Sequence, residues 1–222
     1  MSHSSSDSLV AHHFEDIEQQ TESAVLGMWL FLGQEIMFFG GLFATYLVYR
    51  FKYPEAWAAG SGELNVWYGG INTVVLLVSS LTMAMSVHSA QTGDRKRLLG
   101  FLLITLLLGL TFLGIKTIEY TEKWHHHLVP GAYFQFHSEH FANVNPGNAQ
   151  LFFVLYFFMT GMHAFHMIIG AGLLIWLIVL AYRGHFSPER FLKVELTGFY
   201  WHFVDIVWVF LFPLLYLVDR HA

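Results

Sequence analysis

Residues 199–218, FYWHFVDIVWVFLFPLLYLV, form an almost unbroken apolar and aromatic segment that nevertheless contains His202 and Asp205. A helix of this length spans about 30 Å, which matches the thickness of the hydrocarbon layer of a bilayer. The segment therefore predicts a transmembrane helix. His202 and Asp205 are three residues apart and so share one face of that helix.

The composition of the whole chain also indicates a membrane protein. Charged residues make up 12% of the 222 residues, whereas soluble domains carry about 25%. The aromatic fraction of 18% is typical of side chains that face lipid and the membrane interfaces. The absence of cysteine excludes disulfides, thiolate metal sites and iron–sulfur clusters. The net charge of −5 is weak and spread over loops, which argues against a nucleic-acid partner.

Four more apolar segments lie N-terminal to residues 199–218. The predicted spans cover about residues 24–50, 66–90, 98–118, 149–182 and 195–218. None shows the alternation expected of strands. We therefore predict an all-α polytopic membrane helix bundle with five transmembrane helices, formed by one membrane domain over residues 24–222. Residues 1–23 contain no Lys or Arg and are rich in Ser, His and acidic residues, which predicts a flexible polar tail.

Two features of the connections and spans bear on topology and packing. The short second and fourth connections lie on the same side as the N-terminus and carry most of the cations, so we expect the N-terminus in the cytoplasm and the C-terminus in the periplasm. The His-rich connection at 124–148 is expected to be solvated surface. Small residues on the fourth span predict close approach of a neighbouring helix: Thr160, Gly161, Gly170, Ala171 and Gly172.

Ionisable side chains inside the spans are costly in lipid and should face protein or water. They are Glu35, His163, His166, Glu195, His202 and Asp205. Their spacing predicts a polar stripe of Glu195, His202 and Asp205 on the last span, with the two histidines of the fourth span presented to it. Three interpretations compete: hydrogen bonds that hold helices together, metal or haem ligands, and a proton relay. The spacing disfavours ligands, because no intramembrane histidines stand four residues apart.

Several segments of the chain together resemble one known family. They are GQEIMFFGGLFATY (33–46), INTVVLLVSSLTMAMSVHSAQTGDRKRLLG (71–100), IEYTEKWHH (118–126), TGMHAFHMIIG (160–170) and FYWHFVDIVWVFL (199–211). In this order they are similar to the signature segments of subunit III of haem–copper terminal oxidases, the cytochrome c oxidase subunit III family. The resemblance covers about residues 24–218, and the chain resembles the five-helix bacterial form rather than members with seven spans.

The resemblance implies a non-catalytic core subunit of an aerobic terminal oxidase in the bacterial cytoplasmic (inner) membrane. The complex would transfer electrons from cytochrome c or a quinol to oxygen and pump protons. Haem and copper would belong to the partner subunits I and II, and this chain would hold no metal, cofactor or catalytic residue. It would stabilise subunit I and flank the routes by which oxygen and protons reach it.

The resemblance also implies roles for individual residues. Glu35 matches the family's intramembrane carboxylate, which lies near phospholipids bound in a cleft. Arg183 and His185 fall where family members present basic groups to a phospholipid headgroup. His163, His166, Glu195, His202 and Asp205 would form a structural polar network. Two alternatives stay open: a subunit III-like component of a nitric oxide reductase, and a free-standing proton-coupled membrane carrier.

Overall fold

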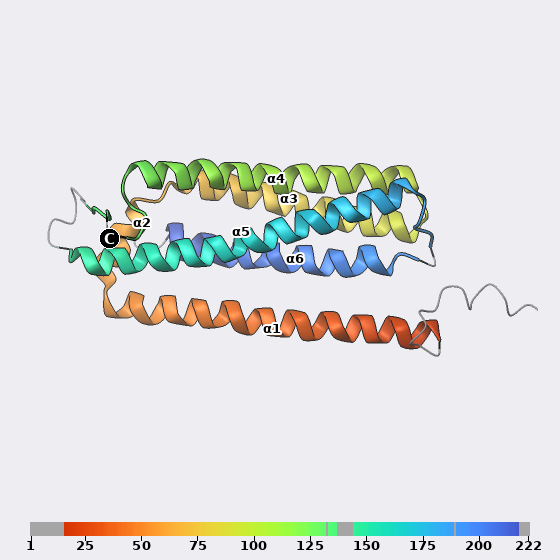
Figure 1. Cartoon of the computed structure of the whole chain (residues 1–222), viewed down its shortest axis with the longest axis horizontal. Coiled ribbons are helices and arrows are strands. Elements are labelled where there is room, and N and C mark those ends of the chain that lie inside the picture. The colour runs from red at the N-terminus through yellow and green to blue at the C-terminus, as the bar shows by residue number, and fades with distance from the viewer. Residues whose placement is uncertain (1–15, 132, 137–143, 189, 218–222) are drawn as a thin grey trace, which may run out of the picture. The chain divides into compact units, whose positions relative to one another are not determined.

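The structure, a computed structural model, describes residues 16–131, 133–136, 144–188 and 190–217. Within these ranges the chain forms helices and no strand (Figure 1). Five helices are long and apolar enough to cross a membrane, which confirms the predicted all-α fold with five transmembrane helices. The helices are α1 (Ile17–Lys52), α2 (Pro54–Gly62), α3 (Val66–Gln91), α4 (Arg95–His125), α5 (Pro146–Tyr182) and α6 (Leu192–Phe212), which continues into a π-helical turn, η1 (Pro213–Leu217).

The chain divides into two compact units, Met1–Phe38 and Phe39–Ala222. The first unit contains the N-terminal part of α1. Residues 1–15 of the predicted polar tail lie outside the described residues, and α1 begins inside the remainder of that tail. Asp16 starts the helix, because its Oδ1 accepts a hydrogen bond from the Gln19 backbone N–H at 2.7 Å and so satisfies one of the free donors of the first turn.

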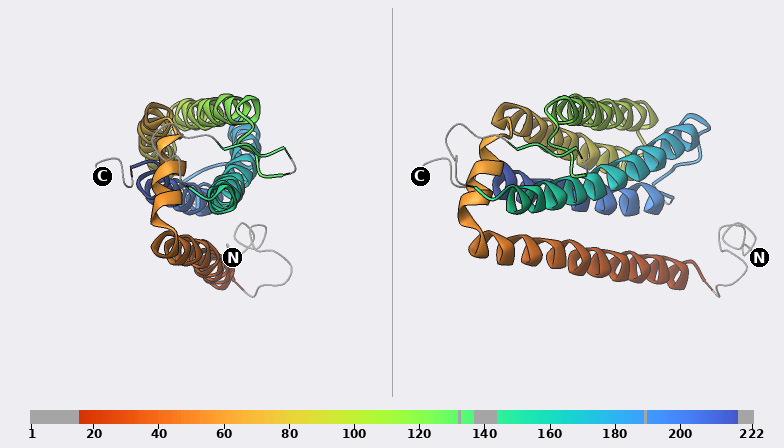
Figure 2. Two further views of the ribbon diagram at one scale, coloured as in Figure 1. Left: turned by 90° about the vertical axis from the view of Figure 1, so that its left-hand side faces the viewer. Right: turned by 60° about the vertical axis from the view of Figure 1, so that its left-hand side comes forward.

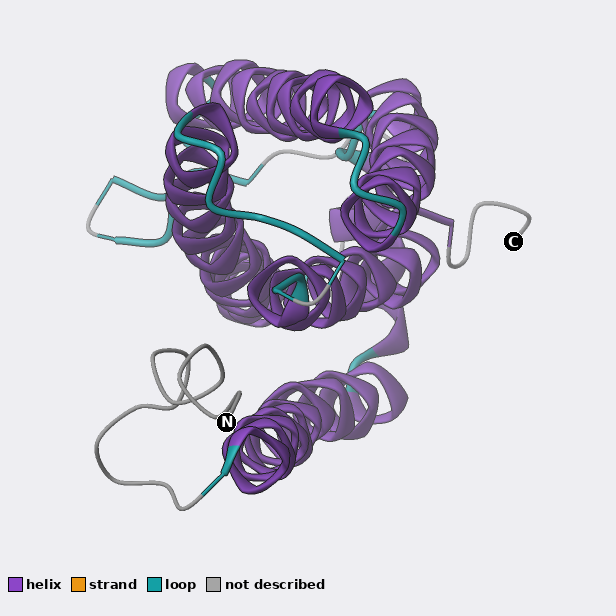
Figure 3. Cartoon of the chain, turned by 90° about the vertical axis from the view of Figure 1, so that its right-hand side faces the viewer, coloured by secondary structure: helices purple, strands orange, loops and turns teal. Residues whose placement is uncertain are grey.

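In the second unit, α3, α4, α5 and α6 close a ring of four helices. Helix α3 contacts α4 and α6, and α5 contacts the same two helices. The ring is visible end-on in Figure 2 and in Figure 3. Side chains that follow the N-cap pattern start three of the helices: Asn65 accepts from the Trp67 N–H, Asp94 from the Arg97 N–H and Asn145 from the Gly147 N–H.

Trp201 of α6 fills the centre of this ring and is fully buried. A Cβ added at Gly109 of α4 would lie 2.7 Å from the Trp201 ring, and one at Gly170 of α5 would lie 2.9 Å from it. The indole Nε1 donates to Ser79 Oγ of α3 at 3.0 Å. One side chain therefore joins all four helices. Of the predicted small residues, Gly170 admits this ring, whereas a Cβ at Gly172 would meet no atom within 4 Å.

The connection between the first two spans is not simply a polar loop. It contains α2, which begins with Pro54 at its first turn, a position that suits proline because no helical donor is lost there. Trp57 is fully buried, with its ring 5.8 Å from that of Tyr46 and 5.7 Å from that of Phe152. The Ser61 hydroxyl donates to the Leu215 carbonyl at 2.9 Å, so α2 also packs on η1.

The outer faces of the long helices expose large apolar side chains. Leu77 of α3 is 54% exposed, Leu107 of α4 is 62% exposed and Ile206 of α6 is 54% exposed. Such surfaces are unfavourable in water but match hydrocarbon, and helices satisfy their own backbone groups there. The chain is a multi-pass membrane protein.

Candidate functional site

Arg183 and His185 lie at the turn where α5 ends. The Arg183 N–H donates to the Val179 carbonyl at 3.1 Å and the His185 N–H donates to the Leu180 carbonyl at 3.0 Å. Gly184 between them has φ of +73°, a left-handed conformation that glycine adopts without strain. Both flanking side chains are exposed as a result. A cation just beyond a span can meet a lipid phosphate.

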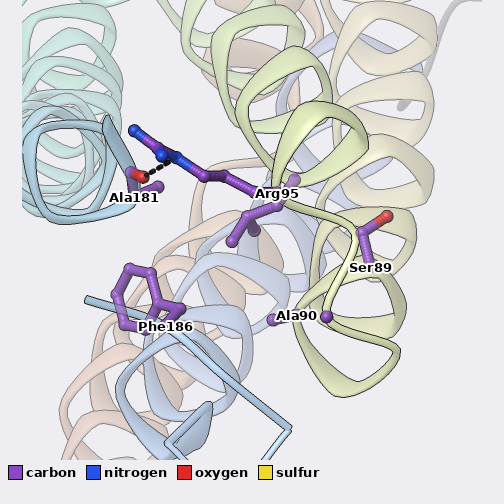
Figure 4. A pocket seen from close by; sticks show the side chains of 7 residues that line it. Ser89, Ala90, Arg95, Ala181 and Phe186 are labelled. Atoms are coloured by element: carbon purple, nitrogen blue, oxygen red, sulfur yellow. Dashed lines mark hydrogen bonds between the residues drawn. The ribbon is translucent and has the colours of Figure 1, made fainter. Parts of the chain in front are cut away.

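Arg95 adds a further contact at this end of α5. Its Nε donates to the Ala181 carbonyl at 2.9 Å (Figure 4), and its Nη2 donates to the Tyr182 carbonyl. These carbonyls belong to the last turn of α5, where the helix dipole favours a cation. Arg95 therefore fastens the start of α4 to the end of α5, beside a small pocket that Ser89, Leu98 and Phe186 help to line.

Glu35 lies on α1 in the first compact unit, whereas Arg183 and His185 belong to the second. It follows Ile17 at a distance of roughly 27 Å along the helix, counted at 1.5 Å per residue. Glu35 therefore lies well inside the span. Lipid headgroups lie at the ends of the span, away from this position.

The two histidines of α5 have separate surroundings. His163 is buried, and its ring centroid lies 5.3 Å from that of Phe112 and 5.2 Å from that of Trp208. Neither of its ring nitrogens has a hydrogen-bond partner within the described part of the chain. His166 Nδ1 donates to the Met162 carbonyl of its own helix at 2.8 Å. Within the described residues, no hydrogen bond therefore joins His163 to the polar residues of α6.

The polar residues of α6 make different contacts from those that the spacing predicts. His202 Nδ1 lies 2.6 Å from the Ser80 hydroxyl of α3. Asp205 is buried at 3% exposure, and among the described residues neither of its carboxyl oxygens has a partner that meets hydrogen-bond geometry. Glu195 lies half-buried in the first turn of α6. Ser80 was not predicted, because its contact joins residues that are distant in sequence.

A metal site would need several convergent ligands. Within the described ranges, no three His, Cys, Asp or Glu side chains are placed to hold a metal ion. The predicted absence of metal and haem from this chain stays a prediction. His137 and His140 of the His-rich connection lie outside the described residues.

A polar cluster in the bundle interior was not predicted from the sequence. Lys116 Nζ lies 2.8 Å from Glu119 Oε2, with both side chains buried. Glu119 Oε1 accepts hydrogen bonds from Tyr216 OH at 2.6 Å and from Tyr156 OH at 3.0 Å. Lys116 also donates to Tyr216 OH at 2.8 Å, and its Nζ lies 5.0 Å from the centroid of the Trp208 ring. A desolvated cation is attracted to an aromatic face at this distance.

The predicted third span ended at residue 118, in the middle of this cluster. Helix α4 in fact continues to His125. The available signal was local: Lys116 and Glu119 are three residues apart, so opposite charges share one helix face next to an apolar run. The polar contacts continue beyond the ion pair, where Tyr68 OH donates to Glu122 Oε1 at 2.9 Å and Lys123 donates to the Glu63 carbonyl.

The π-helical turn η1 carries Tyr216 into the cluster. It begins at Pro213, which has no backbone N–H to continue the α-helical hydrogen bonds. The carbonyl of Leu214 accepts from Tyr46 OH at 2.6 Å and that of Leu215 accepts from Ser61 Oγ. Because the ion pair and the phenols bond to one another, this cluster fixes how α4, α5 and η1 pack.

Comparison with known proteins finds similar sequences along nearly the whole chain. The family model described as cytochrome c oxidase subunit III matches residues 6–219. Cytochrome c oxidase subunit 3 of Corynebacterium diphtheriae is 32% identical over 87% of this chain and 87% of its own length. Quinol oxidase subunit 3 of Bacillus spizizenii is 32% identical over 91% and 92%, and the probable cytochrome c oxidase subunit 3 of Mycobacterium leprae is 34% identical over 87% of each chain. The chain belongs to the cytochrome c oxidase subunit III family.

Proposed function

We propose that this protein is a non-catalytic core subunit of an aerobic terminal oxidase, in which it stabilises subunit I and flanks the routes of oxygen and protons. The family match over residues 6–219 carries the proposal. Haem and copper then belong to subunits I and II, and the complex couples electron transfer to proton pumping. The relatives include subunits of both cytochrome c oxidases and quinol oxidases, so either donor fits.

The membrane complex itself tests this proposal. Purification in mild detergent through a tag on this chain should recover oxidase subunits I and II in equal amounts, together with haem absorption and copper. The chain separated from its partners should be colourless, because no convergent ligand set is present in the part that the structure describes. Recovery of nitric oxide reductase subunits, recovery of the chain alone, or stoichiometric haem in the separated chain would reject the proposal.

A phospholipid is proposed to bind at Arg183 and His185, with Glu35 in the wall of the lipid cleft. An exposed cation next to the headgroups contributes about 1 kcal/mol of attraction to anionic lipid. Arg183→Ala should therefore lower the number of phospholipids retained per complex, counted by mass spectrometry, and shorten the time for which activity persists. Lys96→Ala removes an exposed cation from the first turn of α4 and serves as the matched control.

The same proposal predicts that Glu35→Gln leaves the initial rate of oxygen reduction near that of the wild type, because the carboxyl group would line the cleft rather than carry protons. An immediate loss of oxygen reduction in fully assembled Glu35→Gln enzyme would contradict the assignment and favour the proton-coupled carrier.

The orientation in the bacterial inner membrane is proposed to place the turn between α3 and α4 in the cytoplasm, because Arg95, Lys96 and Arg97 at the start of α4 follow the positive-inside rule. The chain has no native cysteine, so single cysteines report without background. Lys96→Cys should label with an impermeant thiol reagent only after the membrane is opened. Glu55→Cys on α2, which is also exposed, should label in intact cells. The reverse pattern would invert the orientation.

A further inference from the structure

His202 has one ring nitrogen directed into the bundle and the other at its surface. Nδ1 contacts Ser80 Oγ at 2.6 Å. Nε2 makes no hydrogen bond within the described part of the chain. It is also not fully enclosed by protein atoms. The side chain as a whole is half-buried. The Nε2 atom therefore reaches the outer surface of the bundle.

This surface nitrogen lies near the middle of the membrane. His202 follows the start of α6 at Leu192 by roughly 15 Å, and Ser80 follows the start of α3 at Val66 by roughly 21 Å, at 1.5 Å per residue. Both positions are deep within a hydrocarbon layer about 30 Å thick. Lipid tails offer no hydrogen bond, so an imidazole nitrogen that faced them would lack a partner at high cost.

The residues around His202 form an otherwise apolar surface, here called the α3–α6 face and defined by Leu77, Ser80, Ala84, His202 and Ile206. Leu77 and Ile206 are 54% exposed, and Ala84 is exposed. A small residue such as Ala84 lets the backbone of a neighbouring helix approach closely. The face thus combines apolar area, a small residue and one polar atom at mid-membrane depth.

We infer that the α3–α6 face docks against a transmembrane helix of another oxidase subunit, and that this helix presents a hydroxyl, amide or indole group to His202 Nε2. The inference rests on the proposed function, because it requires an oxidase complex. A partner helix can pack against the apolar side chains of this face and can also offer the hydrogen bond that lipid tails cannot. Such interhelical bonds are how polar side chains join membrane helices.

Photo-crosslinking in the intact complex tests which molecule covers this face. A benzophenone amino acid at Ala84 or Ile206 should form a covalent adduct with another oxidase subunit, identified by mass spectrometry. The control position is Leu107 on the outer face of α4, which is similarly exposed. Adducts from Ala84 and Ile206 with lipid alone, in a complex that still contains subunits I and II, would overturn the docking surface and leave the proposed function intact. Failure to recover those subunits at all would reject the function instead.

Substitutions of His202 test the polar contact. His202→Phe keeps a ring but removes Nε2, and it should weaken retention of this subunit in the complex by about tenfold, the effect of one interhelical hydrogen bond. His202→Gln can still donate or accept through its amide and should restore most of the retention. Ser80→Ala removes the inward contact but keeps Nε2, and it should leave retention unchanged. Circular dichroism of each variant checks that the helices are intact. Retention of folded His202→Phe at the wild-type level would refute the inference.

Discussion

Lys116→Met should destabilise this subunit by about 3–5 kcal/mol, because it leaves the Glu119 carboxylate buried without its cation. Glu119 Oε2 lies 2.8 Å from Lys116 Nζ, and both side chains are at most 3% exposed. The phenols of Tyr156 and Tyr216 still donate to Oε1 in the variant, but they cannot balance the charge. A domain of about 200 residues loses roughly 2–4 °C of melting temperature for each kcal/mol. The thermal transition of the detergent-solubilised protein should therefore fall by about 10 °C.

Two further variants separate loss of charge balance from simple damage to α4. In the double variant Lys116→Met with Glu119→Gln, no buried charge is left without a partner, so most of the stability should return. Thr117→Ala changes the exposed neighbouring residue and should leave the transition within a degree or two. If Lys116→Met melts at the wild-type temperature, the ion pair contributes nothing to the fold.

Trp201→Ala should cost about 3–5 kcal/mol, because it opens a large cavity at the centre of the four-helix ring. The variant also removes the donor to Ser79 Oγ. Trp67→Ala is the matched control, because Trp67 is 79% exposed on the outside of α3. Thermal melts of both variants compare the loss of a central tryptophan with the loss of a peripheral one. Equal stability of the two variants would contradict the assignment of Trp201 to the core.

Glycine substitutions probe the same contact from the other side. Gly170→Ala places a Cβ 2.9 Å from the Trp201 ring, and overpacking of this kind costs about 1–3 kcal/mol. Gly172→Ala makes the same chemical change two residues away, where no atom lies within 4 Å of the new Cβ. It should be neutral or slightly stabilising, because alanine favours a helix more than glycine does. Similar melting temperatures for the two variants would mean that Trp201 does not occupy this space.

Gly170 and the polar residues of α6 show what a sequence pattern can predict and what it cannot. Small residues on the fourth span predicted close approach of a neighbour, but the approaching group is the ring of Trp201 rather than a helix backbone. The spacing of His202 and Asp205 placed them on one face, yet the hydrogen-bond partner of His202 is Ser80 on another helix. A spacing rule describes one helix and contains no information about its neighbour.

The five spans, their apolar outer faces and the membrane location were determined by the sequence alone, because the length and hydropathy of a segment are local properties that lipid acts on directly. Tertiary structure decided how the buried charges are satisfied. Lys116 and Glu119 lie one turn apart on α4, but their partners Tyr156 and Tyr216 come from α5 and η1. Whether a buried charge is tolerable depends on which donors and acceptors surround it in space, and only the packing of the four helices determines that.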